Sequence, residues 1–219
     1  MCIQDVTGTK QNRSSIPERQ GMQLKIFGIT GGVGAGKSEV LKYIKEKYNC
    51  RVILADDVGN QVKLPGESCY EALCDLLGKD ILDENGFIVK EKMASSIFSD
   101  KDLLQKVNAI IHPAVEEYIL KEIEKEKLKQ SYDFFFIEAA LLIECGYEKH
   151  VDEMWYIFST EEVRRNRLKS SRMYSDEKID SIMRGQLSEE TFRTHCSVVI
   201  DNSNDFEATK QQIDKLLGE

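Results

Sequence analysis

The sequence predicts an α/β protein with a parallel five-stranded sheet covered by helices on both faces, a helical insertion and a lid. Short, wholly apolar runs alternate with helical patterns, which is typical of a parallel sheet buried on both sides. The first apolar run is followed at once by a stretch rich in glycine and then by a helical pattern. With 219 residues, of which 41% are hydrophobic, the chain is long enough to bury a core of its own.

The expected strands are short runs of apolar, β-branched and aromatic residues. In chain order they span residues 24–29, 51–54, 134–137, 155–158 and 198–200. Between the first two, residues 38–47 place Val40, Leu41 and Ile44 on one face, which is the spacing of an amphipathic helix. The aromatic run from Phe134 to Phe136 predicts a buried strand and not a stacking platform, because neighbouring strand residues point to opposite faces.

The connection between the second and third strands is too long for a simple crossover. Residues 59–131 carry helical patterns broken by the turns Pro65-Gly66 and Asn85-Gly86, so we expect a helical insertion over the C-terminal edge of the sheet. Within it, residues 113–130 are expected to form a long charged helix that begins at Pro113.

These elements predict a single domain over residues 22–219, preceded by a loose N-terminal extension at residues 1–21. The extension is polar and shows no periodicity. Arginines concentrate after the fourth strand, within residues 164–197, which we treat as a separate segment. The core is then expected to consist of residues 22–58, 132–163 and 198–219.

The composition excludes several classes of function. Lysine and arginine number 30 against 38 acidic residues, and a net charge of −8 disfavours non-specific binding of nucleic acid. No apolar run approaches the ~20 residues that span a bilayer, so we expect no membrane partner. The six cysteines show neither a CxxC pair nor zinc-ligand spacing, which is typical of reduced thiols in a cytoplasmic protein.

The glycine-rich stretch matches GxxxxGK[ST], the phosphate-binding P-loop, in its expected context between a strand and a helix. Its residues are Gly31, Gly32, Val33, Gly34, Ala35, Gly36, Lys37 and Ser38. Glycines let successive backbone N–H groups turn toward an anion, and the helix N-terminus adds further donors. We expect the loop to bind a nucleoside triphosphate, with Lys37 on the β- and γ-phosphates and the Ser38 hydroxyl on Mg²⁺.

A P-loop alone does not separate GTPases, motor ATPases and small-molecule kinases. The sequence contains no NKxD-like motif for reading a guanine base, and its segment 134–138 resembles a motor's Walker B strand only loosely. Asp56 follows the second strand at the sheet edge that carries the P-loop, where a carboxylate can accept the proton of an attacking hydroxyl. From position alone, Asp56 or Asp57 is equally well explained as a helix N-cap.

Six segments together make the chain resemble the dephospho-CoA kinase family. They are ITGGVGAGKS (29–38), ADDVGNQVKLPG (55–66), NGFIVKEKMASSIF (85–98), NAIIHPAV (108–115), EAALLIE (138–144) and VIDN (199–202). We expect a monomer or a small homo-oligomer. The resemblance implies ATP-dependent phosphorylation of the ribose 3′-hydroxyl of dephospho-CoA, with Mg²⁺, and it assigns residues 164–197 to the lid. It assigns the insertion to CoA binding. The alternatives are a P-loop kinase for another small hydroxyl acceptor, such as a nucleoside, nucleotide or sugar, and a nucleotide-binding protein with an inactive site.

The resemblance also implies roles for individual residues. Asp56 becomes the catalytic base, Lys37 the phosphate clamp and Arg167 the lid arginine, while Gln186 matches a glutamine further along the lid. Asn202 falls on the loop that meets the adenine of ATP. The substrate side is assigned to Lys90, His112, Leu141, Leu142 and Glu144.

The chain departs from the family pattern around the acceptor. Asn60 stands where the family usually has an arginine four residues after the catalytic aspartate, so one substrate contact is missing or relocated. Lys90 replaces another arginine, keeping the charge but losing bidentate geometry. His112-Pro113 matches the family but is also typical of a helix start, and we favour that structural role for His112.

Overall fold

The computed structural model describes residues 23–98 and 100–218. The predicted N-terminal extension therefore lies outside the described residues. The strands are β1 (Lys25–Thr30), β2 (Cys50–Leu54), β3 (Phe134–Glu138), β4 (Glu153–Phe158) and β5 (Val198–Asp201). They form one parallel sheet in the order β2-β3-β1-β4-β5, which confirms the predicted five-stranded parallel sheet.

An aromatic cluster fills one face of the sheet. Phe27 and Phe136 are register partners on β1 and β3, and their rings stack with centroids 4.9 Å apart. Trp155 on β4 is fully buried and meets Phe27 at 4.8 Å between centroids. The helices α1 (Lys37–Lys47) and α9 (Phe206–Leu217) cover this face through residues such as Ile44 and Ile213.

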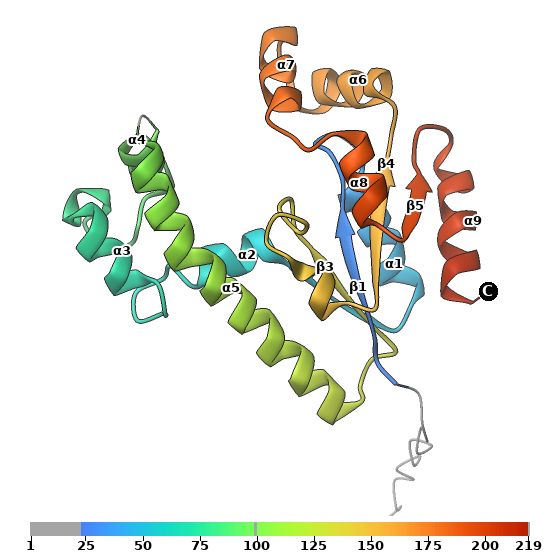
Figure 1. Ribbon diagram of the computed structural model, residues 1–219, viewed down its shortest axis with the longest axis horizontal. Coiled ribbons are helices and arrows are strands. Elements are labelled where there is room, and N and C mark those ends of the chain that lie inside the picture. The colour runs from blue at the N-terminus through green and yellow to red at the C-terminus, as the bar shows by residue number, and fades with distance from the viewer. Residues whose placement is uncertain (1–22, 99, 219) are drawn as a thin grey trace, which may run out of the picture.

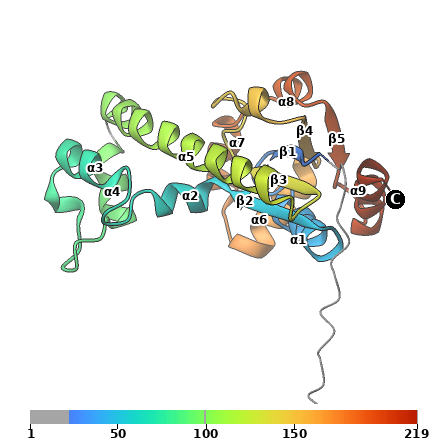
Figure 2. The ribbon, with the colours of Figure 1, turned by 90° about the horizontal axis from the view of Figure 1, so that it is seen from below.

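The opposite face is covered by α5 (Lys101–Lys129), η2 (Tyr147–His150) and α8 (Glu189–His195), whose buried residues pack with β1 and β3 residues such as Phe135. Figure 2 shows α1 and α8 on opposite sides of the sheet. Helices on both faces confirm the predicted layering.

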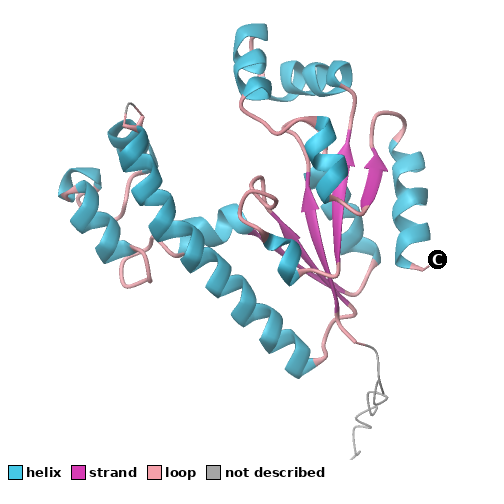
Figure 3. Ribbon diagram, in the orientation of Figure 1, coloured by secondary structure: helices cyan, strands magenta, loops and turns pink. Residues whose placement is uncertain are grey.

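The insertion projects to one side of the sheet (Figure 1). It contains α2 (Ala55–Gln61), α3 (Tyr70–Leu77), η1 (Lys79–Ile81), α4 (Lys90–Ile97) and α5. The predicted lid region holds α6 (Glu161–Arg172), α7 (Asp176–Arg184) and α8. Figure 3 shows α6 and α7 beyond the C-terminal ends of the central strands, which are the ends that carry the P-loop.

The expected start of the long helix at Pro113 is wrong. The helix α5 begins at Lys101, where the Asp100 side chain caps it by accepting a 2.9 Å hydrogen bond from the Leu103 N–H. Pro113 lies inside and removes one backbone hydrogen bond, the one to Ala109. The helix continues through it because residues on both sides are anchored in the core; these are Val107, Val115, Ile119 and Ile123.

Candidate active site

The P-loop connects β1 to α1 and adopts backbone angles that need glycine. Gly31, Gly34 and Gly36 have φ angles of 148°, 84° and 91°. A Cβ on Gly31 would lie 2.5 Å from the carbonyl oxygen of Ile157 on the adjacent strand β4. A Cβ on Gly36, which caps α1, would lie 2.2 Å from Nδ2 of Asn202. The loop is thus folded tightly against its surroundings, with the N-terminus of α1 directly behind it.

Lys37 and Glu138 form a half-buried ion pair beside this loop. The Lys37 Nζ donates a 2.8 Å hydrogen bond to the Gly31 carbonyl and lies 3.5 Å from Glu138 Oε1. Burial lowers the pKa of Lys37, against the opposing charge of Glu138. Burial likewise raises the pKa of Glu138, against the opposing charge of Lys37. The ammonium is therefore held at the loop before any phosphate binds.

Ser38 and Glu138 line one cavity of about 360 Å³ next to α1. A hydroxyl and a carboxylate are oxygen ligands suited to Mg²⁺, which usually keeps several waters and substrate phosphate oxygens in its coordination sphere. Among residues 23–98 and 100–218 no three His, Cys, Asp or Glu side chains group as metal ligands. These residues fit a metal that is bound largely through the nucleotide.

Asp56 sits in the first turn of α2, where β2 ends. The N-cap of α2 is Leu54, and no side chain caps this helix, so the N-cap interpretation of Asp56 and Asp57 is wrong. The Asp56 charge reaches the P-loop pair: it raises the pKa of both Lys37 and Glu138 as a secondary effect. The Asp56 carboxylate therefore does not cap α2, and its charge is felt by the two ionised side chains beside the P-loop.

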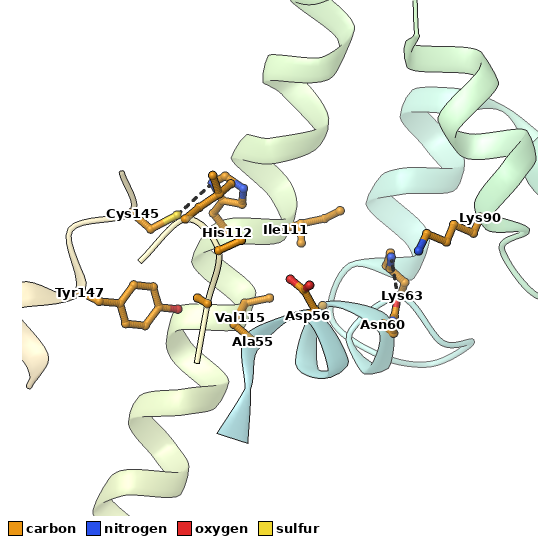
Figure 4. A pocket seen from close by; sticks show the side chains of 14 residues that line it. Ala55, Asp56, Asn60, Lys63, Lys90, Ile111, His112, Val115, Cys145 and Tyr147 are labelled. Atoms are coloured by element: carbon orange, nitrogen blue, oxygen red, sulfur yellow. Dashed lines mark hydrogen bonds between the residues drawn. The ribbon is translucent and has the colours of Figure 1, made fainter. Parts of the chain in front are cut away.

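Asp56 also lines a second cavity, of about 350 Å³, which we call the acceptor pocket. The insertion supplies one wall through α2, the following turn, α4 and α5, and the loop after β3 supplies the other. Its lining residues, most of them labelled in Figure 4, are Ala55, Asp56, Gly59, Asn60, Lys63, Lys90, Ile111, His112, Val115, Ala139, Ala140, Leu141, Cys145 and Tyr147.

The structure brings only some of the expected substrate-side residues together. Lys90, His112 and Leu141 line the acceptor pocket with Asp56. Leu142 is fully buried in the core and packs near Gly28, while Glu144 is exposed; neither belongs to the pocket wall. The leucine at position 142 therefore shapes the loop and does not meet the pocket.

His112 lies within α5, not at its start, and contacts Cys145 across the pocket. Its Nδ1 is 3.7 Å from the Cys145 Sγ (Figure 4). Burial raises the pKa of the Cys145 thiol, which keeps the sulfur protonated near neutral pH. The structural role expected for His112 as a helix boundary is wrong, because Pro113 does not start the helix.

Arg167 and Asn202 both bond the P-loop backbone at Ala35. Arg167 donates to the carbonyls of Ala35 and Asn202, at 3.2 and 3.0 Å, and to the Ser159 hydroxyl at 3.1 Å. The fully buried Asn202 donates from Nδ2 to the same Ala35 carbonyl at 2.8 Å and accepts from Thr209 at 3.0 Å. Neither side chain points freely into a cavity, so the adenine contact expected near Asn202 stays a prediction.

Arg164, one helical turn before Arg167, is the lid residue that lies over the P-loop. Its Nε donates to the Val33 carbonyl at 2.9 Å, and its guanidinium also bonds the Gln186 side chain. A Cβ on Gly32 would lie 2.4 Å from this guanidinium. Sequence reasoning counted Arg164 among the basic residues of the lid without singling it out. The i,i+3 spacing to Arg167 on one helix was the signal that both side chains can reach the P-loop.

No described helix is long and apolar enough to cross a membrane.

The family model for dephospho-CoA kinase matches residues 25–208. Dephospho-CoA kinases of Carboxydothermus hydrogenoformans and Streptococcus mutans are 34% and 33% identical to this chain over 190 and 193 residues. These alignments cover 87% and 88% of this chain, and 91% and 96% of the two relatives.

Solved structures share the fold. A crystal structure from Thermus thermophilus has a TM-score of 0.75 at 24% identity, covering 89% of this chain and 97% of that one. The dephospho-CoA kinase of Campylobacter jejuni has a TM-score of 0.67 at 20% identity, covering 88% and 94%. The family model and the curated relatives match most of the described residues, including the P-loop. The chain therefore belongs to the dephospho-CoA kinase family.

Proposed function

We propose that this chain transfers the γ-phosphoryl group of ATP to the ribose 3′-hydroxyl of dephospho-CoA, giving CoA and ADP. The observation that carries the proposal is the position of Asp56, which lines the acceptor pocket and interacts electrostatically with Lys37 of the P-loop. The Asp56 carboxylate thus faces the pocket for the acceptor and also interacts with the P-loop that binds the phosphates. Membership of a family of ATP-using kinases supports the same reaction.

In the proposed reaction, the Asp56 carboxylate accepts the proton of the 3′-hydroxyl as that oxygen attacks the γ-phosphorus. The bond from the γ-phosphorus to the bridging oxygen breaks, and ADP leaves with the electron pair. Negative charge develops on the transferring group and on the bridging oxygen, where the Lys37 ammonium and the loop N–H groups stabilise it. Because Lys37 is already held by Gly31 and Glu138, little reorganisation is needed.

The Ser38 hydroxyl would hold Mg²⁺ together with the nucleotide, and the metal would neutralise part of the phosphate charge. Arg164, bonded to the Val33 carbonyl, places a further cation beside the phosphates, and Arg167 keeps the loop in shape. We assign the lid role to residues 164–197, which contain both arginines, and CoA binding to residues 59–131, which supply half of the residues that line the acceptor pocket. Closure of such a lid excludes water that would otherwise hydrolyse ATP.

The test is a coupled assay of ADP release with dephospho-CoA, ATP and Mg²⁺, with mass spectrometry of the acceptor. Formation of CoA in step with ADP is the expected result. ADP release only with a nucleoside, nucleotide or sugar acceptor would overturn the choice of substrate. ATP binding without ADP release for any acceptor would instead identify a binding protein with an inactive site.

A further inference from the structure

The wall of the acceptor pocket carries a second lysine besides Lys90. Lys63 lies in the turn that follows α2, is half-buried, and donates a 3.2 Å hydrogen bond to Oδ1 of Asn60. Figure 4 shows the amine ends of Lys63 and Lys90 directed into the same part of the pocket that Asp56 also lines. No motif in the sequence points to Lys63.

The two ammonium groups lack partners that would neutralise them. Neither forms an ion pair with any carboxylate among the described residues, and the only polar contact of Lys63 there is neutral Asn60. Burial lowers the pKa of Lys63, and the positive charge of Lys90 lowers it further, against the weaker opposing charges of Cys69 and Asp56. Two like charges brought together on a pocket wall favour binding of an anion between them, because the anion relieves their mutual repulsion.

The position of this pair relative to Asp56 suits the acceptor. Asp56 and Asn60 are one turn apart on α2 and therefore share a face, and Lys63 follows directly after the helix. In dephospho-CoA the diphosphate is attached to the 5′-carbon of the same ribose whose 3′-hydroxyl reacts. An anion site close to the base is thus where that diphosphate must lie when the hydroxyl reaches Asp56.

We propose that Lys63, positioned by Asn60, binds the diphosphate of the acceptor together with Lys90. The cation that the family resemblance expects at position 60 is in this chain displaced by three residues, to position 63. Asn60 has become the residue that orients it. This inference rests on the proposed function and identifies a specificity-determining contact of the same site.

The first experiment compares steady-state kinetics of the full chain and Lys63→Met. We expect the KM for dephospho-CoA to rise about tenfold or more, the range for losing a hydrogen bond to a charged group. The kcat and the KM for ATP should stay within about twofold, since the contact is made equally in the ground and transition states. Lys63→Arg should keep most of the affinity. The matched control Lys106→Met removes the same charge from an exposed position of α5 outside the pocket, and should leave all three constants unchanged.

The second experiment returns the positive charge from position 63 to position 60. Adding Asn60→Arg to Lys63→Met should recover most of the lost affinity, which a purely structural role of Lys63 would not allow. Raised ionic strength should weaken acceptor binding to the wild type more than to Lys63→Met, because salt screens the charge contact. An unchanged KM for dephospho-CoA in Lys63→Met would overturn the inference. A KM for dephospho-CoA that is as high in Lys63→Arg and in Asn60→Arg/Lys63→Met as in Lys63→Met would overturn it as well. Wild-type protein inactive toward dephospho-CoA would refute the proposed function instead.

Discussion

The ammonium of Lys37 lies 3.5 Å from the carboxylate of Glu138, which is the last residue of β3. Because β3 is paired with β1, which leads into the P-loop, the sheet itself positions the acid against the loop lysine. Burial lowers the pKa of Lys37 and raises the pKa of Glu138, and the charge of each partner opposes the shift of the other. The ion pair thus keeps both groups charged and holds the Lys37 ammonium at the loop. The arrangement is preorganised for an anion, since an incoming phosphate finds the cation already in place.

Lys37→Ala should abolish most turnover, because the transferring phosphoryl group loses its main cation. It also leaves Glu138 without its partner, next to where the phosphates bind. We therefore expect Lys37→Ala to weaken ATP binding, and Lys37→Ala/Glu138→Gln to recover part of that binding but not the turnover. Equilibrium binding of ATP and the coupled assay separate the two effects. A fully active Lys37→Ala protein would remove Lys37 from the mechanism.

Asp56→Asn should lower kcat by about 10²–10⁴-fold, the usual effect of losing a general base. The amide keeps the size of the side chain but cannot accept the proton of the hydroxyl. ATP binding should persist, because Asp56 is not part of the P-loop. The neighbouring exposed residue gives a matched control: Asp57→Asn should retain activity, since Asp57 does not line the acceptor pocket. Equal kcat for wild type and Asp56→Asn would exclude Asp56 as the base.

Gly36→Ala should impair both stability and ATP binding. The φ angle of 91° disfavours any side chain, and the new Cβ would meet the Nδ2 of Asn202 at 2.2 Å. Asn202 is buried and bonded to Ala35 and Thr209, so it cannot move aside cheaply. We expect a loss of about 1–3 kcal/mol in the free energy of unfolding, measured by urea denaturation. Gly66→Ala is the control: its φ angle is also positive, at 85°, but nothing lies within 4 Å of the added Cβ. Equal losses in the two variants would show that the approach of Asn202 does not matter.

Much of the fold could be predicted because its signals are local. Each strand is a short apolar run, and the P-loop with the helix after it is fixed by glycines, Lys37 and Ser38 in order. The start of α5 was missed because a proline normally begins or ends a helix. Here, burial of Val107 before it and Val115 after it outweighs the lost hydrogen bond.

The side chains around the site depend on tertiary contacts that no local pattern shows. Arg164 and Arg167 are chemically equal in the sequence, yet Arg164 bonds the Val33 carbonyl and lies against Gly32, whereas Arg167 bonds the carbonyls of Ala35 and Asn202. Leu141 and Leu142 are adjacent, but only the first lines the acceptor pocket, because the second is needed in the core beside Gly28. Lys63 was missed because its partner Asn60 departs from the family pattern, which pointed to a lost contact and not to its replacement.

The base of the insertion is held to the sheet by a buried charge cluster. Arg51 on β2 donates a 2.6 Å hydrogen bond to Glu126 on α5 and also bonds Glu122. The two glutamates are 1% and 7% exposed. Arg51→Met should therefore cost about 3–5 kcal/mol in the free energy of unfolding at pH 7, because it leaves the buried Glu126 carboxylate without its cation, while Glu122 keeps its bond from Lys125. Lys121→Met, which breaks the exposed pair with Glu117, should cost no more than about 0.5 kcal/mol by the same urea measurement.

The pH dependence of this loss tests its electrostatic origin. A hydrogen bond from Lys125, and more weakly the charge of Arg51, hold the pKa of Glu122 below its ordinary value of 4.5. A carboxyl whose pKa is lower in the folded than in the unfolded state stabilises the fold above about pH 4.5, and this contribution is lost as the pH falls through the folded value. The stability gap between wild type and Arg51→Met should therefore narrow as the pH falls below about 4.5, since a protonated Glu122 no longer interacts with the charge of the arginine. A gap that stays constant over this range would mean that Arg51 stabilises the fold through packing of its aliphatic stem and not through its charge.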